Sequence, residues 1–402
     1  MNLLKDGIAN KIVLKTVATR KLTIDGLTQI YPVYKVKLDY LFFNDQNDRI
    51  ATWISQYKTD NNGKTPDISN LDEYNNVIEK FIIESNPEAI KKTQNNIELV
   101  EQREAGVVLA DGRIIDGNRR FTCLRKLAKK NPKFGYFETV ILDRDINTNA
   151  KQIKILELSI QHGEESKVDY NPIDRLVGIY NDILETKLLT VQEYAASINE
   201  SESDVKKYIE IAKLMVEYLE FINAPKQFYI ARDLQLYTPL EDLYRLTKKC
   251  STNDEVEDLK ISVFNNILMQ TVTDMSRFIR NIKMIVGSEY QEEFFEEQKE
   301  LAEKVVEKLP PVGQMNISVI RDHIRTNDEI ARALENSMEK TLLKVRKKES
   351  INRPIQLLEK ATNFAESVDV NMILKMNDSE IRRFERQLDK LEKIVNELKE
   401  NL

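Results

Sequence analysis

The stretch from Gly106 to Leu127 constrains the fold most, because its hydrophobic period changes partway along. Val107 to Leu109 is a short apolar run typical of a strand, and Asp111-Gly112 is a hairpin signal before Ile114-Ile115 resume the strand. After Asp116-Gly117-Asn118 the apolar residues fall at helical spacing, at Phe121, Leu124, Leu127 and Ala128. The stretch therefore predicts strand, tight turn, strand, tight turn and helix, in that order.

The second turn, from Asp116 to Arg120, predicts a phosphate site. Gly117 permits a positive φ and a close backbone approach, Asn118 is a good N-cap, and Asp116 would orient the turn. Arg119 and Arg120 follow in the first helical turn, where the helix dipole disfavours cations, so we expect an anion such as phosphate beside them. The alternative is that both arginines are solvated and Gly117 serves only the turn; spacing alone does not separate the two.

The string from Ile115 to Arg120, IDGNRR, resembles the conserved turn of the ParB/sulfiredoxin-like family, which follows a hairpin and opens a helix. Its extension, DGNRRFTCL, is similar to the DGQQRLT box of GmrSD-type restriction proteins, which share that fold. Upstream, Asn44, Asn47 and Arg49 match the Asn-x-x-Asn-x-Arg pattern near the opening strand of ParB domains, and downstream Glu157 to Ile173 occupies the place of their second box. The resemblance covers roughly residues 30–220.

The resemblance implies an α+β fold: a ParB/sulfiredoxin-like domain with a small mixed sheet over residues 1–150, then helix-turn-helix-like and all-helical regions. It implies a bound nucleoside triphosphate, CTP or ATP, with magnesium. The family's second box reads Glu-Asn-x-Gln-Arg, whereas residues 158–162 read LSIQH, so only Gln161 is kept as a binding residue. Glu157 sits one place early and is the candidate magnesium ligand, while His162 is expected to be a surface residue.

Composition limits the remaining function classes. A length of 402 residues allows two or three domains, and a net charge of −6 confines any nucleic-acid contact to a local basic patch. Two distant cysteines give no disulfide framework, and two histidines nearly exclude histidine-based zinc sites and most catalytic triads. The first residues lack the apolar core of a signal peptide and no run approaches a membrane span, so a cytoplasmic location without membrane contact is expected.

Residues 151–225 are predicted to be helical and to contain a helix-turn-helix-like segment. Thr190 is expected to cap a helix from Val191 to Ile198, and Asn199 suits a turn that needs a positive φ. The presumed recognition helix opens with acidic residues, and Lys206 and Lys207 are its only early basic residues. Because carboxylates repel phosphates, we expect DNA binding through these lysines to be weak.

The C-terminal half is predicted to form a helical domain at 226–308 and a helical region at 314–402, separated by the linker-like string LPPVG. Its last helix carries apolar residues at alternating spacings of three and four, a coiled-coil-like seam that favours a homodimer or an intramolecular hairpin. A parallel pair is disfavoured, because Glu380 would face Glu385 of the partner chain. The seam residues are Ile381, Phe384, Leu388, Leu391, Val395, Leu398 and Leu402.

Three functions follow from these features. The first is a nucleotide-dependent switch in DNA partition or in a mobile-element or phage-defence system. The second is a nuclease or phosphoryl-transfer enzyme of a defence system; no catalytic base is identified, so at most slow nucleoside triphosphate hydrolysis is expected. The third is a non-catalytic scaffold that binds a protein partner. Fold does not decide among them.

Overall fold

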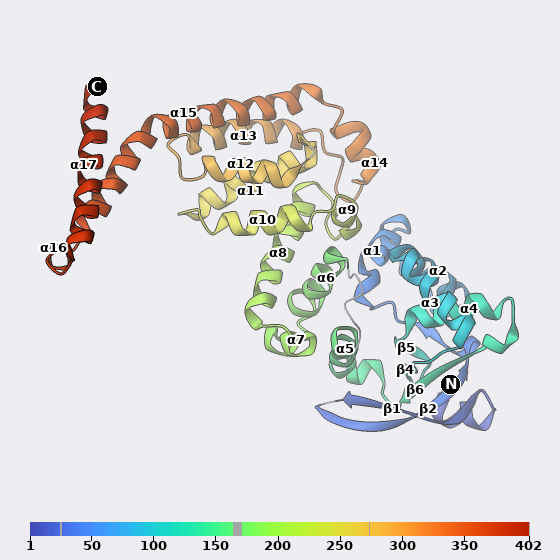
Figure 1. Cartoon of the computed structure of the whole chain (residues 1–402). Coiled ribbons are helices and arrows are strands. Elements are labelled where there is room, and N and C mark those ends of the chain that lie inside the picture. Colours follow the sequence, from blue (N-terminus) through green and yellow to red (C-terminus); the bar gives the residue numbers. More distant parts are fainter. Residues whose placement is uncertain (25, 164–170, 273, 402) are drawn as a thin grey trace. The chain divides into compact units, whose positions relative to one another are not determined.

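A mixed sheet organises the N-terminal part of the chain (Figure 1). The computed structural model describes residues 1–24, 26–163, 171–272 and 274–401, so Asp25, predicted to separate the halves of the first hairpin, lies outside the described residues. The chain divides into two compact units, Met1–Glu339 and Lys340–Leu402. In the described part, the α+β class with a mixed sheet followed by helices is confirmed.

Six strands of the described chain form the sheet in the order β1-β2-β6-β4-β5-β3. Neighbours are antiparallel for β1–β2, β2–β6 and β4–β5, and parallel for β4–β6 and β3–β5. The predicted hairpin that precedes the Asp116 turn is therefore confirmed as β4–β5, at the inner part of the sheet. The strands are β1 (Val13–Ile24), β2 (Leu27–Lys37), β3 (Phe42–Phe43), β4 (Gly106–Leu109), β5 (Arg113–Asp116) and β6 (Tyr136–Leu142).

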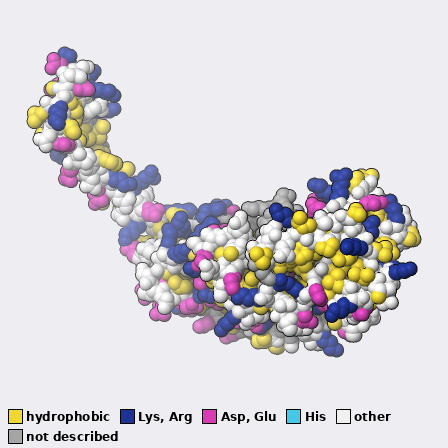
Figure 2. Space-filling view, turned by 90° about the horizontal axis from the view of Figure 1, so that it is seen from below, with side chains coloured by type: hydrophobic (Ala, Val, Ile, Leu, Met, Phe, Trp, Pro, Cys, Tyr) yellow, Lys and Arg dark blue, Asp and Glu magenta, His cyan; other side chains and the backbone are white. Residues whose placement is uncertain are grey.

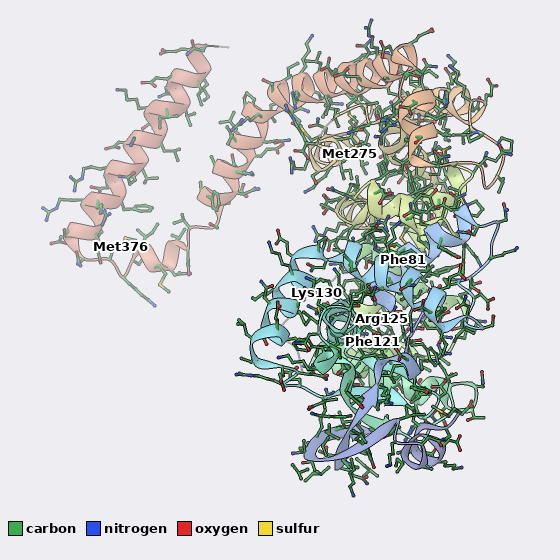
Figure 3. All side chains as sticks on the ribbon, turned by 90° about the vertical axis from the view of Figure 1, so that its right-hand side faces the viewer. Phe81, Phe121, Arg125, Lys130, Met275 and Met376 are labelled. Atoms are coloured by element: carbon green, nitrogen blue, oxygen red, sulfur yellow. The ribbon has the colours of Figure 1, made fainter. Side chains whose placement is uncertain are left out.

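Four helices cover one face of the sheet: α1 (Ala51–Asp60), α2 (Leu71–Ser85), α3 (Pro87–Val100) and α4 (Asn118–Ala128). Apolar residues at helical spacing predict a helix from Leu71 to Ser85, and α2 has these bounds. Asn86 ends it and caps α3, because its side chain accepts a hydrogen bond from the Ala89 N–H at 3.0 Å. Phe121 anchors α4 to the sheet, with its ring centroid 4.8 Å from that of Phe43 and 6.0 Å from that of Phe137 (Figure 3).

Helix α5 (Ile146–Gly163) packs on the opposite face of the sheet. Ile153, Leu156 and Ile160 of α5 meet the strand residues that alternate with those facing the first four helices. Short helical turns connect these elements. They are η1 (Leu3–Gly7), η2 (Leu38–Tyr40), η3 (Asp48–Ile50) and η4 (Pro132–Phe134).

The helix-turn-helix-like segment follows its prediction in geometry. It consists of α7 (Val191–Ile198) and α8 (Glu202–Phe221), preceded by α6 (Pro172–Ile179) and η5 (Tyr180–Glu185). Thr190 and Glu193 form a reciprocal capping box at the start of α7, and Asn199 ends it with a φ of 54°.

The remaining helices of the first unit are more broken than the sequence predicts. A single helix was expected from Arg232 to Lys249, but the structure has α9 (Phe228–Asp233) and α10 (Tyr237–Thr247), because Gln235 takes a φ of 54° between them. The linker-like string is non-helical and lies within the first unit, where the Gly313 N–H donates to the Asn223 carbonyl at 2.9 Å. The other elements are α11 (Asn253–Met269), α12 (Met275–Ile285), α13 (Gln291–Val306), α14 (Ile317–Val319) and η6 (Ile320–Ile324).

The second unit consists of the C-terminal part of α15 (Asp328–Glu366), then α16 (Val370–Ile373) and α17 (Asp378–Glu400). Pro354 lies inside α15, where it removes one helical hydrogen bond. Asn377 caps α17 in a reciprocal capping box with Glu380. None of the helices in the described part of the chain combines the length and the apolar character that a membrane crossing requires.

Candidate nucleotide-binding site

The turn between β5 and α4 exposes the start of a helix. The helix begins one residue earlier than predicted: Gly117, and not Asn118, is the N-cap, with a φ of 100° and no side-chain hydrogen bond to the first turn. Asn118 takes the first helical position because the left-handed glycine already turns the chain. The first N–H groups of α4 therefore lack a side-chain cap, as an anion site at a helix start requires.

Gly117 is required for packing as well as for its φ. A Cβ at this position would lie 2.7 Å from Cζ of Phe137 on β6, closer than side-chain atoms approach one another. The same ring constrains Gly106 at the start of β4, where a Cβ would lie 2.4 Å from the same Cζ. The turn is thus held tightly against the sheet.

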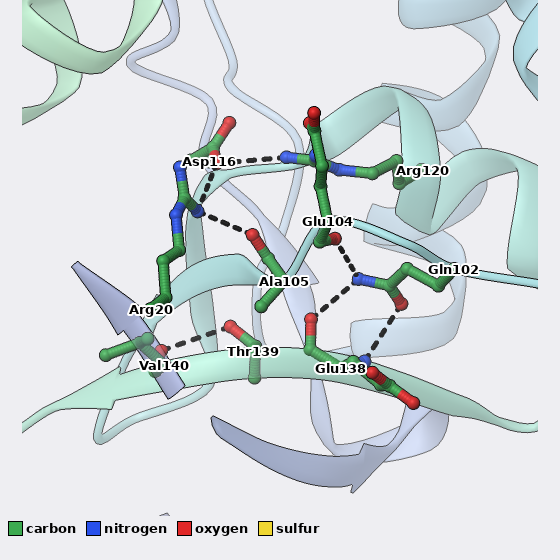
Figure 4. Close-up of polar contacts among 9 residues, drawn as sticks. All are labelled: Arg20, Gln102, Glu104, Ala105, Asp116, Arg120, Glu138, Thr139 and Val140. Carbon is green, nitrogen blue, oxygen red and sulfur yellow. Dashed lines mark hydrogen bonds and ion pairs between the residues drawn. The ribbon is translucent and has the colours of Figure 1, made fainter. Parts of the chain in front are cut away.

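Two arginines share one oxygen of Asp116 (Figure 4). Arg120 donates to Oδ2 of Asp116 at 3.0 Å and to Glu104 at 2.8 Å. Arg20, from β1, donates to the same Oδ2 at 2.9 Å and to the Ala105 carbonyl at 2.5 Å. Asp116 thus orients the turn, as predicted, but the sequence did not identify Arg20 and Glu104, because they reach the turn only through the pairing of distant strands.

A cavity of about 680 Å³ opens beside this turn. All six residues predicted to bind nucleotide or phosphate line it: Asp116, Gly117, Asn118, Arg119, Arg120 and Gln161. Asn47 and Arg49 of the upstream motif also line it, although the sequence places them far from the turn. One wall comes from α3 and the segment after it, which no sequence motif marks as part of a site. Among its residues are Asn86, Lys92, Thr93, Asn96, Gln102 and Arg103.

Two amide oxygens in the cavity wall are buried without a partner. Oδ1 of Asn118 and Oε1 of Gln161 accept no hydrogen bond from any described residue. Gln161 uses its Nε2 group to donate to Glu157 at 3.1 Å. Because a buried unsatisfied acceptor is costly, these two oxygens favour a ligand that offers N–H or O–H groups.

Beneath the cavity, Lys154 of α5 is buried among three carboxylates. Its Nζ lies 2.7 Å from Asp48, 3.5 Å from Asp182 and 3.8 Å from Glu157. Burial alone would lower the pKa of Lys154, but the three carboxylates raise it well above its usual value, so the ammonium is kept charged. Burial raises the pKa of Glu157, so its carboxyl group takes up a proton at a higher pH than an exposed glutamate does.

The surroundings of Glu157 do not fit a magnesium ligand. Its side chain is 2% exposed, faces the Lys154 ammonium and accepts a hydrogen bond from Gln161, so a metal ion there would compete with a buried cation. Glu157 is also absent from the cavity wall. Among the described residues, no group of three or more His, Cys, Asp or Glu side chains is arranged to hold a metal ion. The side chain of His162 lies outside the described part of the structure.

The two lysines predicted to contact DNA already have acidic neighbours. Lys207 pairs with Glu241 of α10, and Lys206 lies 3.7 Å from Glu202 in the same helix. Glu202 and Asp204 are exposed at the start of α8, in its first turn. Weak DNA binding by this segment stays a prediction, and these ion pairs add a physical reason for it.

No protein-family model matches this sequence, and a search of curated proteins finds no match. The ParB/sulfiredoxin-like resemblance therefore stays a prediction that rests on the quoted motifs.

Proposed function

We propose that the cavity beside Asp116–Arg120 binds a nucleoside triphosphate and that the protein is a nucleotide-dependent switch. The observation that carries the proposal is the position of the uncapped start of α4, with Arg119 and Arg120, in the wall of a cavity of about 680 Å³. That volume lies within the range of small-molecule sites, roughly 300–1,000 Å³.

The phosphates would lie at the start of α4. Backbone N–H groups and the positive end of the helix dipole attract anions there, and two arginines in the first turn add guanidinium donors. The carboxylates of Asp116 and Glu104 hold Arg120 in place at the turn. Arg49, Lys92 and Arg103 line the same cavity and would contact the remaining phosphates, although the wall also carries carboxylates such as Glu88 and Glu101.

The nucleoside would lie toward Asn118 and Gln161. Their two unpartnered oxygens match N–H groups of a base or hydroxyl groups of a ribose, which inorganic phosphates lack. A nucleotide is therefore a better fit than a phosphate ion or polyphosphate alone.

Gln161 would connect the cavity to the helical region. It hydrogen-bonds Glu157, and the Lys154 beside Glu157 contacts Asp48 near α1 and Asp182 in η5. A nucleotide that engages Gln161 would bias this buried network, and a contiguous polar chain of this kind can carry coupling between domains. DNA partition and phage defence are the settings that the motif resemblance implies for such a switch.

Calorimetric titration with the four ribonucleoside triphosphates and with inorganic tripolyphosphate tests the proposal. We expect one triphosphate to bind more tightly than tripolyphosphate. The Arg119→Ala/Arg120→Ala variant should lose both ligands, because the phosphate contacts are removed. The Gln161→Ala variant should weaken the nucleotide selectively.

Lys130→Ala is the matched control, since Lys130 is an exposed cation just after α4 and outside the cavity wall. It should bind like the unmodified protein. The arginine variant loses the ion pairs of Arg120 with Asp116 and Glu104, so its thermal midpoint without ligand should fall modestly while the fold is kept. If the arginine variant retains full affinity, the ligand binds elsewhere. If none of the four nucleotides binds, the proposed function is wrong.

A further inference from the structure

The second unit, Lys340–Leu402, exposes many large hydrophobic side chains, part of which are visible in yellow in Figure 2. Helix α17, described throughout 378–400, has no buried residue. The large hydrophobic residues of this unit that are more than one third exposed, from Ile351 onward, are Ile351, Ile355, Leu357, Leu358, Phe364, Val368, Val370, Met372, Leu374, Ile381, Leu388, Leu391, Ile394, Val395 and Leu398.

Eleven of these residues lie on α15 and α17, and part of them form a stripe along each of the two helices. On α17 the seam from Ile381 to Leu398 keeps its alternating spacing of three and four residues, and Leu388 and Leu391 at its centre are 50% and 41% exposed. On α15, Ile351, Ile355 and Leu358 follow helical spacing and are 63%, 57% and 49% exposed. Soluble proteins rarely leave such a continuous stripe in water, so it marks an interaction surface.

The amount of surface approaches what a stable dimer needs. A large aliphatic side chain offers about 60–120 Å² when fully exposed, so the eight exposed stripe residues, about half exposed, present on the order of 250–450 Å² of apolar surface. A standard interface buries about 800 Å² on each partner, of which a little more than half is apolar. The stripes of one unit, covered by the same stripes of another, therefore approach the apolar area of a specific interface.

The seam of α17 is also suited to an identical partner. The spacing of its apolar residues is the same from the N-terminal end as from the C-terminal end. In an antiparallel pair of α17 helices, each apolar seam residue of one copy can therefore pack against an apolar seam residue of the other. The helix carries six basic and seven acidic residues, so two copies approach without strong net repulsion. A symmetric pair uses the same patch on both subunits, which is the commonest arrangement of soluble oligomers.

We propose that the exposed stripes of α15 and α17 are covered by the same stripes of a second copy, so that the protein is a dimer held by its C-terminal unit. Two such helical pairs would bury their stripes against each other as a bundle of four helices. The proposal is independent of nucleotide binding.

Light scattering on the full-length protein tests the dimer. The chain has a mass of 46.8 kDa, and the unmodified protein should show twice that mass at micromolar concentration. Leu391→Asp and Leu358→Asp should each shift it to the mass of one chain, because an unpaired charge would be buried in the interface. Both positions are exposed in the single chain, so the substitutions should leave the fold of the first unit intact.

Asn396→Asp is the matched control, because it adds the same charge to α17 outside the seam. It should keep the dimer mass. A single-chain mass for the unmodified protein would overturn the proposal and mean that the chain covers the stripes itself. A dimer mass for both seam variants would also overturn it, because the interface would then lie elsewhere. Nucleotide affinity is measured separately, so failure of the dimer leaves the proposed function standing.

Discussion

At the scale of single residues, the site depends on groups whose roles come from close packing. Gly117 was predicted from the sequence to be a turn residue, and the structure adds that its missing Cβ makes room for Phe137. Asn118 was predicted as the helix cap, and that was wrong, because a left-handed glycine before it already serves as the cap. In a sequence of glycine followed by asparagine, either residue can be the N-cap of the helix, and only the backbone angles show which one it is.

Gly117→Ala should lower the free energy of unfolding by about 2–4 kcal/mol, since the new Cβ combines a left-handed backbone with a clash against Phe137. Gly26→Ala is the control: its φ is 76°, but no atom lies within 4 Å of the added Cβ, so about 1 kcal/mol is expected. Urea unfolding of both variants measures the difference. If both variants lose the same free energy of unfolding, the Phe137 ring does not prevent a side chain at position 117.

At the scale of elements, the sequence predicted the helices and turns whose formation depends on residues that are close together in the chain. The bounds of α2, the β4–β5 hairpin and the Thr190 capping box follow from hydrophobic spacing and cap residues. The wall formed by α3, the Arg20 contact and the buried Lys154 cluster depend on how distant segments pack, which spacing does not encode. The break at Gln235 was missed because a non-glycine residue rarely takes a positive φ.

The contact between α1 and α6 should depend on pH. The Thr52 N–H, at the start of α1, donates to Oδ1 of Asp174 on α6 at 3.0 Å. Burial raises the pKa of Asp174 to about 7, so the folded protein holds this proton where the unfolded chain, with an ordinary pKa near 3.8, has lost it. The contribution of Asp174 to the free energy of unfolding is therefore fully present below the pKa that Asp174 has in the unfolded chain, and it is lost as the pH rises to about 7.

Asp174→Asn keeps the acceptor oxygen and removes the titration. Relative to this variant, the unmodified protein should lose stability by about 1 kcal/mol per pH unit between pH 5 and 7. Urea unfolding at several pH values measures the difference. Parallel stability profiles for the two proteins would show that Asp174 does not titrate in this range.

At the scale of the whole molecule, the two units carry separate proposals: a nucleotide cavity in the first and a dimer surface in the second. The sequence predicted the α+β class, and the family resemblance grouped Gln161 with the Asp116–Arg120 turn. Hydrophobic spacing could not predict that Asn47 and Arg49 line the same cavity, because strand order and helix packing bring them there.

Hydrogen exchange with and without saturating nucleotide tests the location of the site most directly. The first N–H groups of α4 lack a side-chain cap and should exchange readily in the free protein. Bound phosphate should protect the peptide covering Gly117 to Phe121 and leave α17 unchanged. If a nucleotide binds while this peptide keeps its free rate, the account of the site is contradicted.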